Sequence, residues 1–286
     1  MCELLGMSAN VPTDICFSFT GLMRRGGHTG PHRDGWGVAF YEGRGCRIFQ
    51  DPRPSIDSEI ARLLLHYSIK SCNVICHIRR ATHGRVALEN THPFQRELWG
   101  RPWVFAHNGK LKAVKRWPLS DYFHPVGTTD SEHAFCWLLG RIRERFPNPP
   151  RRRATLWRYL AELARELDTL GTFNMLMSDG HVLYAFCSTH LAWLTRCAPF
   201  GEARLLDTEL TVDFTEVTTP DDVVTVIATR PLTSNEIWTT MAPSSLVVFD
   251  GGFPFDVCDN GKILPLPLQH PCLGTHSGTR SPLRQS

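Results

Sequence analysis

The 286-residue sequence predicts an α+β fold in which strands and helices form separate layers. Segments typical of strands come first, two or three helices follow near the middle, and further strands come after them. Strand and helix do not alternate regularly, which argues against a doubly wound parallel sheet. The 42% hydrophobic content is enough for a sizeable core in one large domain or two modest ones.

In the first part of the chain, a glycine-rich loop leads into a strand predicted over residues 36–41. Apolar residues at helical spacing then predict a helix over 58–69. A strand over 73–79 follows, and its alternation places His77 and Arg79 on the same face.

A short strand over 103–106 is expected to end at a turn formed by residues 107–109, with the sequence His-Asn-Gly. Two helices are predicted next, over 131–146 and 154–170. The prolines between them favour a turn within one domain rather than a domain boundary, because the connecting segment is short.

The last third of the chain is predicted to be rich in strands. A Ser-Asp-Gly turn joins a hairpin over 173–177 and 182–187, and further strands are expected over 222–228, 236–239 and 245–249. The segment after residue 272 is rich in Pro, Ser, Gly and Arg, which is typical of a peripheral tail.

Charge and composition argue against several classes of protein. Lys and Arg number 31 against 28 Asp and Glu, a net charge of +3 that is weak for a dedicated nucleic-acid binder. No apolar run approaches the ~20 residues that span a bilayer, and no signal peptide precedes residue 2. We therefore expect a cytoplasmic protein whose ten cysteines carry free thiols.

Cys2 is a candidate nucleophile, because Met1 is usually removed when a small residue follows it. The product would carry a thiol and a free α-amine on one residue. An α-amine has a pKa of about 8, so a usable neutral fraction can accept the thiol proton at physiological pH. One residue would then supply nucleophile and base, although an ordinary buried cysteine is the alternative for an isolated Cys at position 2.

Four motifs follow in order: His77-Ile78-Arg79-Arg80-Ala81-Thr82-His83-Gly84, Asn90-Thr91-His92-Pro93, His107-Asn108-Gly109 and Thr129-Asp130-Ser131-Glu132. With the N-terminal Met-Cys, they resemble the H-x-R-x-A-T-x-G, N-x-H-P, H-N-G and T/S-D-[ST]-E motifs of class II glutamine amidotransferases. The resemblance covers residues 2–250 as one amidotransferase domain and leaves 251–286 as a C-terminal extension. It implies the N-terminal-nucleophile (Ntn) hydrolase fold, a four-layer αββα sandwich.

The resemblance also implies how glutamine would be held. Arg79 matches the residue that binds the substrate α-carboxylate, which suits a planar guanidinium. The alternative for Arg79 is a salt bridge at the surface or at a sheet edge. Asp130 matches the acid that receives the substrate α-ammonium, and its alternative is a helix N-cap before Ser131.

Asn108 and Gly109 match the oxyanion hole, with the Asn amide and the Gly backbone N–H facing the tetrahedral intermediate. The alternative for this pair is a plain Asn-Gly turn. Thr82, His83 and His92 match positions that line or brace the glutamine pocket, and a structural role beside a strand is their alternative.

The sequence also departs from the family pattern. Relatives commonly have an aromatic residue where Arg80 stands, and the synthetases begin Cys-Gly-Ile rather than Cys2-Glu3-Leu4. After residue 250 the chain leaves no room for the ammonia-consuming domain of those synthetases. The closest likeness is therefore to stand-alone members of the family.

The implied activity is cleavage of the side-chain amide of glutamine or of a γ-glutamyl conjugate through a Cys2 thioester. Ammonia from glutamine would pass to a separate synthetase subunit as partner. A non-catalytic glutamine-binding or scaffold subunit and a redox-sensing thiol protein are the rival hypotheses. No cofactor is implied, and the spacing of Cys72, Cys76 and the nearby histidines does not supply two paired sets of zinc ligands.

Overall fold

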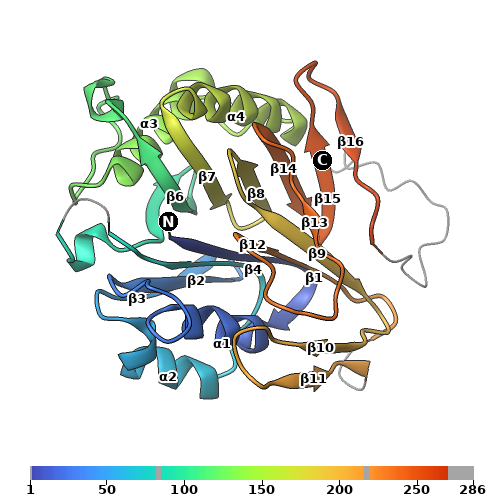
Figure 1. Cartoon of the computed structure of the whole chain (residues 1–286). Coiled ribbons are helices and arrows are strands. Elements are labelled where there is room, and N and C mark those ends of the chain that lie inside the picture. The colour runs from blue at the N-terminus through green and yellow to red at the C-terminus, as the bar shows by residue number, and fades with distance from the viewer. Residues whose placement is uncertain (1, 82–84, 216–218, 270–286) are drawn as a thin grey trace.

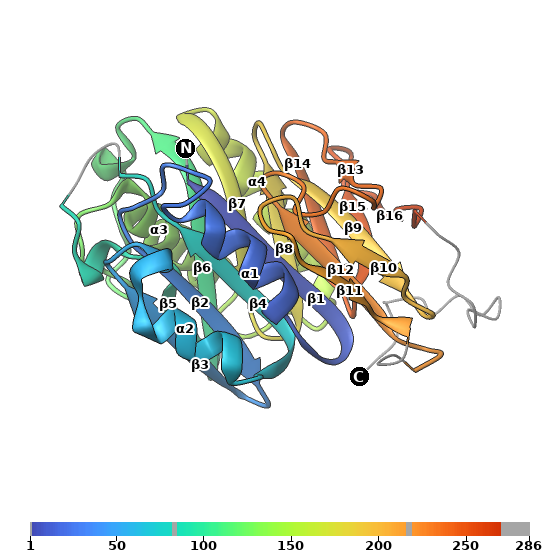
Figure 2. The same ribbon diagram turned by 60° about the horizontal axis from the view of Figure 1, so that its bottom comes forward.

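The structure is a computed structural model that describes residues 2–81, 85–215 and 219–269. Two seven-stranded antiparallel sheets stack face to face, and a pair of helices covers the outer face of each sheet (Figure 1). Figure 2 shows the same layers from below, with the helices of the first pair lying across their sheet. This arrangement confirms the αββα sandwich.

The first sheet contains the N-terminal strand near its centre. In spatial order its strands are β13 (Thr239–Thr240), β9 (Ala192–Cys197), β12 (Val223–Ala228), β1 (Glu3–Asp14), β4 (Lys70–Ile78), β2 (Trp36–Glu42) and β3 (Gly45–Asp51). Its outer face is covered by α1 (Cys16–Arg25) and α2 (Glu59–His66). The short ribbon of β10 (Glu202–Arg204) and β11 (Thr211–Asp213) lies outside both large sheets.

The second sheet is built from later segments. In spatial order its strands are β16 (Ile263–Pro265), β15 (Phe253–Val257), β14 (Ser245–Asp250), β8 (Val182–Cys187), β7 (Gly171–Ser178), β6 (Arg101–Leu111) and β5 (Phe94–Leu98). Its outer face is covered by α3 (Asp130–Arg145) and α4 (Arg153–Asp168). Short 3-10 helices connect some of the elements: η1 (Ser55–Asp57), η2 (Leu88–Asn90) and η3 (Val114–Arg116).

Three apolar cores hold the four layers together. One lies between α1, α2 and the first sheet, another between α3, α4 and the second sheet, and a third between the two sheets. The predicted alternation of β4 is confirmed, because Ile75 belongs to the inter-sheet core whereas Val74, Cys76 and Ile78 belong to the outer core.

Several expectations differ from the structure. The His-Asn-Gly turn is wrong: β6 runs through these residues because they pair with β7, with Asn108 opposite Asn174. The strand expected over 236–239 is reduced to Thr239–Thr240, and α1 was missed because its Gly21 and β-branched Thr20 weaken the helical signal. The second sheet continues past the expected boundary at residue 250 through β15 and β16.

Two further observations bear on the sequence-based expectations. Eight described cysteines carry free thiols, but Cys197 on β9 is disulfide-bonded, so the expectation of free thiols is wrong at that position. None of the described helices combines the length and the apolar character needed to cross a lipid bilayer.

Candidate active site

Cys2 lies immediately before β1, at one end of the central strand of the first sheet. It is partly exposed, and its sulfur contacts the backbone that follows β4. The backbone N–H of Arg80 donates to Cys2 Sγ over 3.3 Å, and the thiol lies 3.6 Å from the carbonyl oxygen of Arg80. Strand pairing explains this proximity, because Glu3 is opposite Ile78 in the β1–β4 ladder.

Strand alternation directs Cys2 into the space between the sheets. Leu4 belongs to the inter-sheet core, and residues two positions apart on a strand share a face. The same rule applies on β4, where Ile75 is in that core and His77 is fully buried two positions later. The thiol and the His77 ring therefore face the second sheet at the same end of the sandwich.

Asn108 reaches the same space from the second sheet. It shares a face of β6 with Ala106 of the inter-sheet core, and β6 packs against both β1 and β4. The side chain is 1% exposed, yet neither its Nδ2 nor its Oδ1 has a hydrogen-bond partner among the described residues. A buried amide without partners is costly unless something binds it, so this group is available to a ligand.

The backbone of Asn108 is held by a buried neighbour on β7. Asn174 Nδ2 donates to the carbonyl oxygen of Asn108 over 3.1 Å. The Asn174 Oδ1 accepts from three successive backbone N–H groups, those of Ser188, Thr189 and His190. The backbone of Asn108 is therefore held in place, while its side-chain amide has no hydrogen-bond partner among the described residues.

Gly109 is required by the close approach of β7. A Cβ at this position would lie 1.8 Å from the carbonyl oxygen of Thr172, a distance that no larger residue could accommodate. The N–H of Leu111 donates to Asp130 Oδ2 over 2.8 Å rather than to β7. Backbone groups two residues apart on a strand point the same way, so the Gly109 N–H also points away from β7.

Asp130 is the first residue of α3 and is not its N-cap, which corrects the alternative stated from the sequence. Thr129 is the N-cap, and its side chain accepts from the N–H of Glu132 over 3.1 Å. The Asp130 carboxylate instead accepts from the N–H groups of Leu111 and Ser131. It therefore joins the start of α3 to the end of β6, beside Gly109.

Arg79 is 4% exposed, which argues against the salt bridge at the surface that was one of its alternatives. Its Nη1 donates to the carbonyl oxygen of Arg85 over 3.3 Å. Its backbone is fixed from both sides: the Arg79 N–H donates to Gly35 O over 2.7 Å, and the Asp34 N–H donates to Arg79 O over 3.1 Å. Asp34 Oδ2 also accepts from the N–H of Ala81 over 2.7 Å.

Two histidines stack inside this end of the sandwich. The ring centroids of His77 and His92 are 4.2 Å apart, and His92 also packs against Phe94. No ring nitrogen of either histidine has a partner within the described part of the chain. Burial lowers the pKa of His77 to about 3 and that of His92 well below its usual value, so both rings are neutral at physiological pH.

His107 differs from that pair because its ring nitrogens have partners. Its Nδ1 lies 2.8 Å from Ser131 Oγ and its Nε2 lies 3.1 Å from Thr172 O. Burial lowers its pKa as well. His107 therefore joins β6 to the first turn of α3.

The Cys2 thiol is not a preformed thiolate. Burial raises its pKa above the ordinary value, while the Arg80 N–H and the Arg79 guanidinium act in the opposite direction and Asp34 adds to the increase. Because thiolates are the reactive species, a base must take the proton when the sulfur attacks.

Of the residues predicted for the site, Cys2, Arg79, His92, Asn108, Gly109 and Asp130 are described, whereas Thr82 and His83 lie outside the described residues. Sequence reasoning missed the bracing by Asp34 and Asn174. Asp34 lies in the glycine-rich stretch that leads into β2, and no sequence pattern pointed to Asn174. Within the described residues, no group of three or more His, Cys, Asp or Glu is arranged to hold a metal ion.

Comparison with known proteins identifies the family over most of the chain. Residues 1–264 match the family model described as class II glutamine amidotransferases. YafJ of Escherichia coli (strain K12), which carries the provisional name of a glutamine amidotransferase, is 61% identical over 249 residues. The match covers 87% of this chain and 97% of YafJ. A similarly named Haemophilus influenzae protein is 47% identical over 253 residues, covering 88% of this chain and 85% of that protein.

Solved structures agree with these relatives. The 2.0 Å crystal structure of a protein named "predicted glutamine amidotransferase" from Pseudomonas aeruginosa PA01 is 56% identical, with a TM-score of 0.71. The match covers 88% of this chain and 99% of that chain. The glutamine phosphoribosylpyrophosphate amidotransferase of Bacillus subtilis is 13% identical with a TM-score of 0.53, covering 93% of this chain and 49% of that chain. This second likeness concerns the fold alone.

Proposed function

This chain belongs to the class II glutamine amidotransferases, and on that premise we propose that it cleaves γ-glutamyl amides through a thioester at Cys2. The observation that carries the proposal is the buried Asn108 amide, which faces the same inter-sheet space as the Cys2 thiol and has no partner among the described residues. An oxyanion hole needs such a donor, held in place before the reaction begins.

The proposed reaction starts after removal of Met1, which makes Cys2 the N-terminal residue. The neutral α-amine of Cys2 takes the proton of its own thiol as the sulfur attacks the side-chain carbonyl carbon of the substrate. A thiol that is protonated until the attack needs such a base, because only the thiolate is nucleophilic.

The tetrahedral intermediate carries its negative charge on the former carbonyl oxygen. The Asn108 Nδ2 and the Gly109 N–H are the proposed donors to this oxygen. The carbon–nitrogen bond then breaks, and the leaving amine takes the proton from the Cys2 ammonium. A water molecule attacks the remaining thioester, which releases glutamate and restores the thiol.

Recognition of the glutamyl head is assigned to two fixed charges. The buried Arg79 guanidinium would bind the α-carboxylate, and Asp130 would receive the α-ammonium. The Asp130 carboxylate is held by backbone N–H groups at the end of β6, beside Gly109, which supports a place for it near the oxyanion hole. His92 would brace this pocket by stacking on His77, and Thr82 and His83 would line it.

The proposed substrates are glutamine and γ-glutamyl conjugates, because both present the same glutamyl head to these residues. With glutamine, the released ammonia would pass to a synthetase subunit as partner. With a conjugate, the leaving group would be a larger amine. A non-catalytic glutamine-binding subunit is the alternative, and retention of Met1 would favour it because the Cys2 nitrogen would then lie in a peptide bond.

The test is the intact mass of the full-length protein before and after treatment with a diazoketone analogue of glutamine. Before treatment, we expect a mass that lacks Met1. After treatment, we expect the mass of one covalent adduct in addition. Cys2→Ala should abolish the adduct, and Cys258→Ala is the matched control because Cys258 is also a partly exposed free thiol. An adduct that persists in Cys2→Ala, or a protein that retains Met1 and gains no adduct, would contradict the proposal.

A further inference from the structure

The N-terminal end of β1 has a ladder partner on one side only. On the β4 side, pairing begins with Glu3 opposite Ile78. On the other side, pairing with β12 begins only at Leu5 opposite Ala228. Beyond Ala228, the chain is joined to β1 by Thr229, which accepts from the Leu4 N–H over 2.9 Å through its Oγ1 and donates its own N–H to Leu4 O over 3.1 Å.

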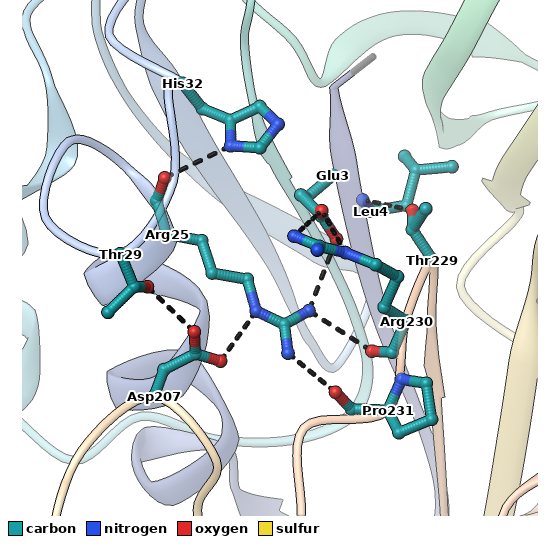
Figure 3. Close-up of polar contacts among 9 residues, drawn as sticks. All are labelled: Glu3, Leu4, Arg25, Thr29, His32, Asp207, Thr229, Arg230 and Pro231. Carbon is teal, nitrogen blue, oxygen red and sulfur yellow. Dashed lines mark hydrogen bonds and ion pairs between the residues drawn. The ribbon is translucent and has the colours of Figure 1, made fainter.

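The Glu3 side chain extends this attachment on the helix-covered face of β1. Glu3 is 3% exposed, and its carboxylate binds two arginines (Figure 3). Arg25 Nη1 donates to Glu3 Oε2 over 3.3 Å, and Arg230 Nε donates to Glu3 Oε1 over 2.8 Å. The carboxylate thus connects β1 to the last residue of α1 and to the segment that follows β12.

Arg25 is the centre of this group and is itself 4% exposed. Besides Glu3, it donates to Asp207 Oδ2 over 2.7 Å, to Arg230 O over 3.2 Å and to Pro231 O over 2.6 Å (Figure 3). Two arginines and two carboxylates therefore balance in charge. We call Glu3, Arg25, Asp207 and Arg230 the anchor cluster.

The anchor cluster holds the residue next to Cys2, so it can affect the position of the reacting groups. Chain ends fray unless they are tied down. Under the proposed function, Cys2 is the terminal residue and supplies both the attacking sulfur and the base. Glu3 is then the first residue after the nucleophile, and its side chain is tied to α1 and to the segment that follows β12. A displacement of ~1 Å at a reacting group can cost about 100-fold in rate.

Net stability is a weak explanation for so buried a set of charges. Desolvation offsets much of the attraction in a buried ion pair, and well-packed apolar residues often stabilise a fold equally well. What ion pairs and forked hydrogen bonds add is a fixed geometry.

We propose that Glu3 is a positioning residue, which fixes Cys2 and its α-amine through the anchor cluster. This inference rests on the proposed function. It does not place Glu3 in contact with the substrate, because strand alternation puts its side chain on the opposite face of β1 from the Cys2 thiol.

The test compares Glu3→Gln with Glu236→Gln in the full-length protein. Glu236 also binds an arginine through both oxygens, with Arg196 Nε and Nη2 at 2.7 Å, in a mostly buried pair away from Cys2. For hydrolysis of a γ-glutamyl anilide, Glu3→Gln should lower kcat by about 10- to 100-fold with KM within about twofold. Glu3→Asp, which keeps the charge, should recover part of the loss, and Glu236→Gln should change neither constant.

A second readout does not require turnover. Alkylation of Cys2 by iodoacetamide, followed by mass spectrometry of the N-terminal peptide across pH, reports the exposure and pKa of the thiol. Glu3→Gln should raise the rate toward that of an unhindered peptide thiol, and Arg230→Gln, a milder change at a side chain that is 59% exposed, should act in the same direction.

The outcomes separate the two proposals. Wild-type protein that neither hydrolyses the anilide nor takes up the diazoketone would overturn the proposed function, and the alkylation rates would still test positioning. Equal effects of Glu3→Gln and Glu236→Gln at the same fraction folded, or no effect of Glu3→Gln on alkylation, would overturn the positioning role.

Discussion

The two faces of β1 at its N-terminal end differ in how their polar groups are paired. On the helix-covered face, each charged side chain of the anchor cluster binds at least one other member. On the opposite face, Cys2 faces the space between the sheets. Nearby, His77, His92 and Asn108 have polar atoms without partners in the described chain. We call these four residues the inter-sheet site.

This difference indicates that the two faces of β1 have different roles. Buried polar groups that are paired within the protein fix its geometry, whereas buried groups left unpaired are costly and persist where a ligand or water completes them. A substitution in the anchor cluster should therefore reduce stability as well as activity. A substitution at Asn108 should reduce activity with little loss of stability.

The largest effect is expected from Arg25→Met. This change leaves the buried Glu3 carboxylate with Arg230 alone and removes the ion-pair partner of Asp207, which keeps the hydrogen bond from the Thr29 hydroxyl. Removing one member of a buried ion pair costs about 3–5 kcal/mol in the free energy of unfolding. Urea unfolding would measure this, with Arg47→Met as control because Arg47 forms an exposed pair with Glu42. A loss no larger than that of the control would contradict the anchoring role.

Asn108→Ala should have the next largest effect, and on the rate rather than on stability. Loss of one oxyanion-hole donor lowers kcat by about 100- to 1000-fold. Because the amide has no partner in the part of the chain that the structure describes, the loss of stability should be limited to that of the removed side-chain volume. Asn174→Ala is the informative contrast, because it breaks a fully bonded buried amide and should destabilise the fold. Near-normal kcat in Asn108→Ala would exclude Asn108 from the oxyanion hole.

Arg79→Lys should have a smaller effect, which tests substrate binding at the edge of the inter-sheet site. Lysine keeps the charge but lacks the planar fork that matches a carboxylate. Loss of one charge-assisted hydrogen bond, roughly 1.5 kcal/mol, should raise KM for the glutamyl substrate about tenfold with kcat little changed. Steady-state kinetics with glutamine and a γ-glutamyl anilide would show this. An unchanged KM for both would remove Arg79 from carboxylate binding.

Sequence patterns predicted the inter-sheet site better than the anchor cluster for a physical reason. The motifs containing Arg79, Asn108 and Asp130 are short, and each is local to one strand or helix end. Alternation along β4 predicted the face of His77, which the core confirms. The roles of these residues remain predictions until they are tested.

The anchor cluster depends on contacts between distant segments, and no local pattern reports them. Glu3 and Arg25 are 22 residues apart, and Arg25 and Asp207 are 182 apart. The misjudged turn at His107-Asn108-Gly109 has the same cause, because pairing with β7 overrides the local Asn-Gly preference. Propensity predicts an element only where tertiary contacts do not oppose it.

The smallest predicted effect is a loss of folding stability in mild acid. It tests the burial of the histidines in the inter-sheet site. His77 has a folded-state pKa of about 3 against an ordinary value of 6.5, so the unfolded chain binds more protons between these values. The stabilisation from burying the neutral ring is thus present above pH 6.5 and is lost as pH falls toward 3. The expected loss from this histidine is about 0.7 kcal/mol between pH 7 and pH 6.

His77→Phe should remove this share of the acid sensitivity, because phenylalanine does not titrate and the His77 ring nitrogens have no partner to lose among the described residues. Urea unfolding at pH 6, 6.5 and 7 would measure the slope. His66→Gln is the matched control, since it replaces a histidine that is exposed on α2. His92, whose pKa is also well below its usual value, would keep part of the slope in the His77→Phe variant. An identical slope in wild type and His77→Phe would mean that the stacked histidines are not neutral and buried in solution, and that the contrast between the two faces of β1 is weaker than the structure indicates.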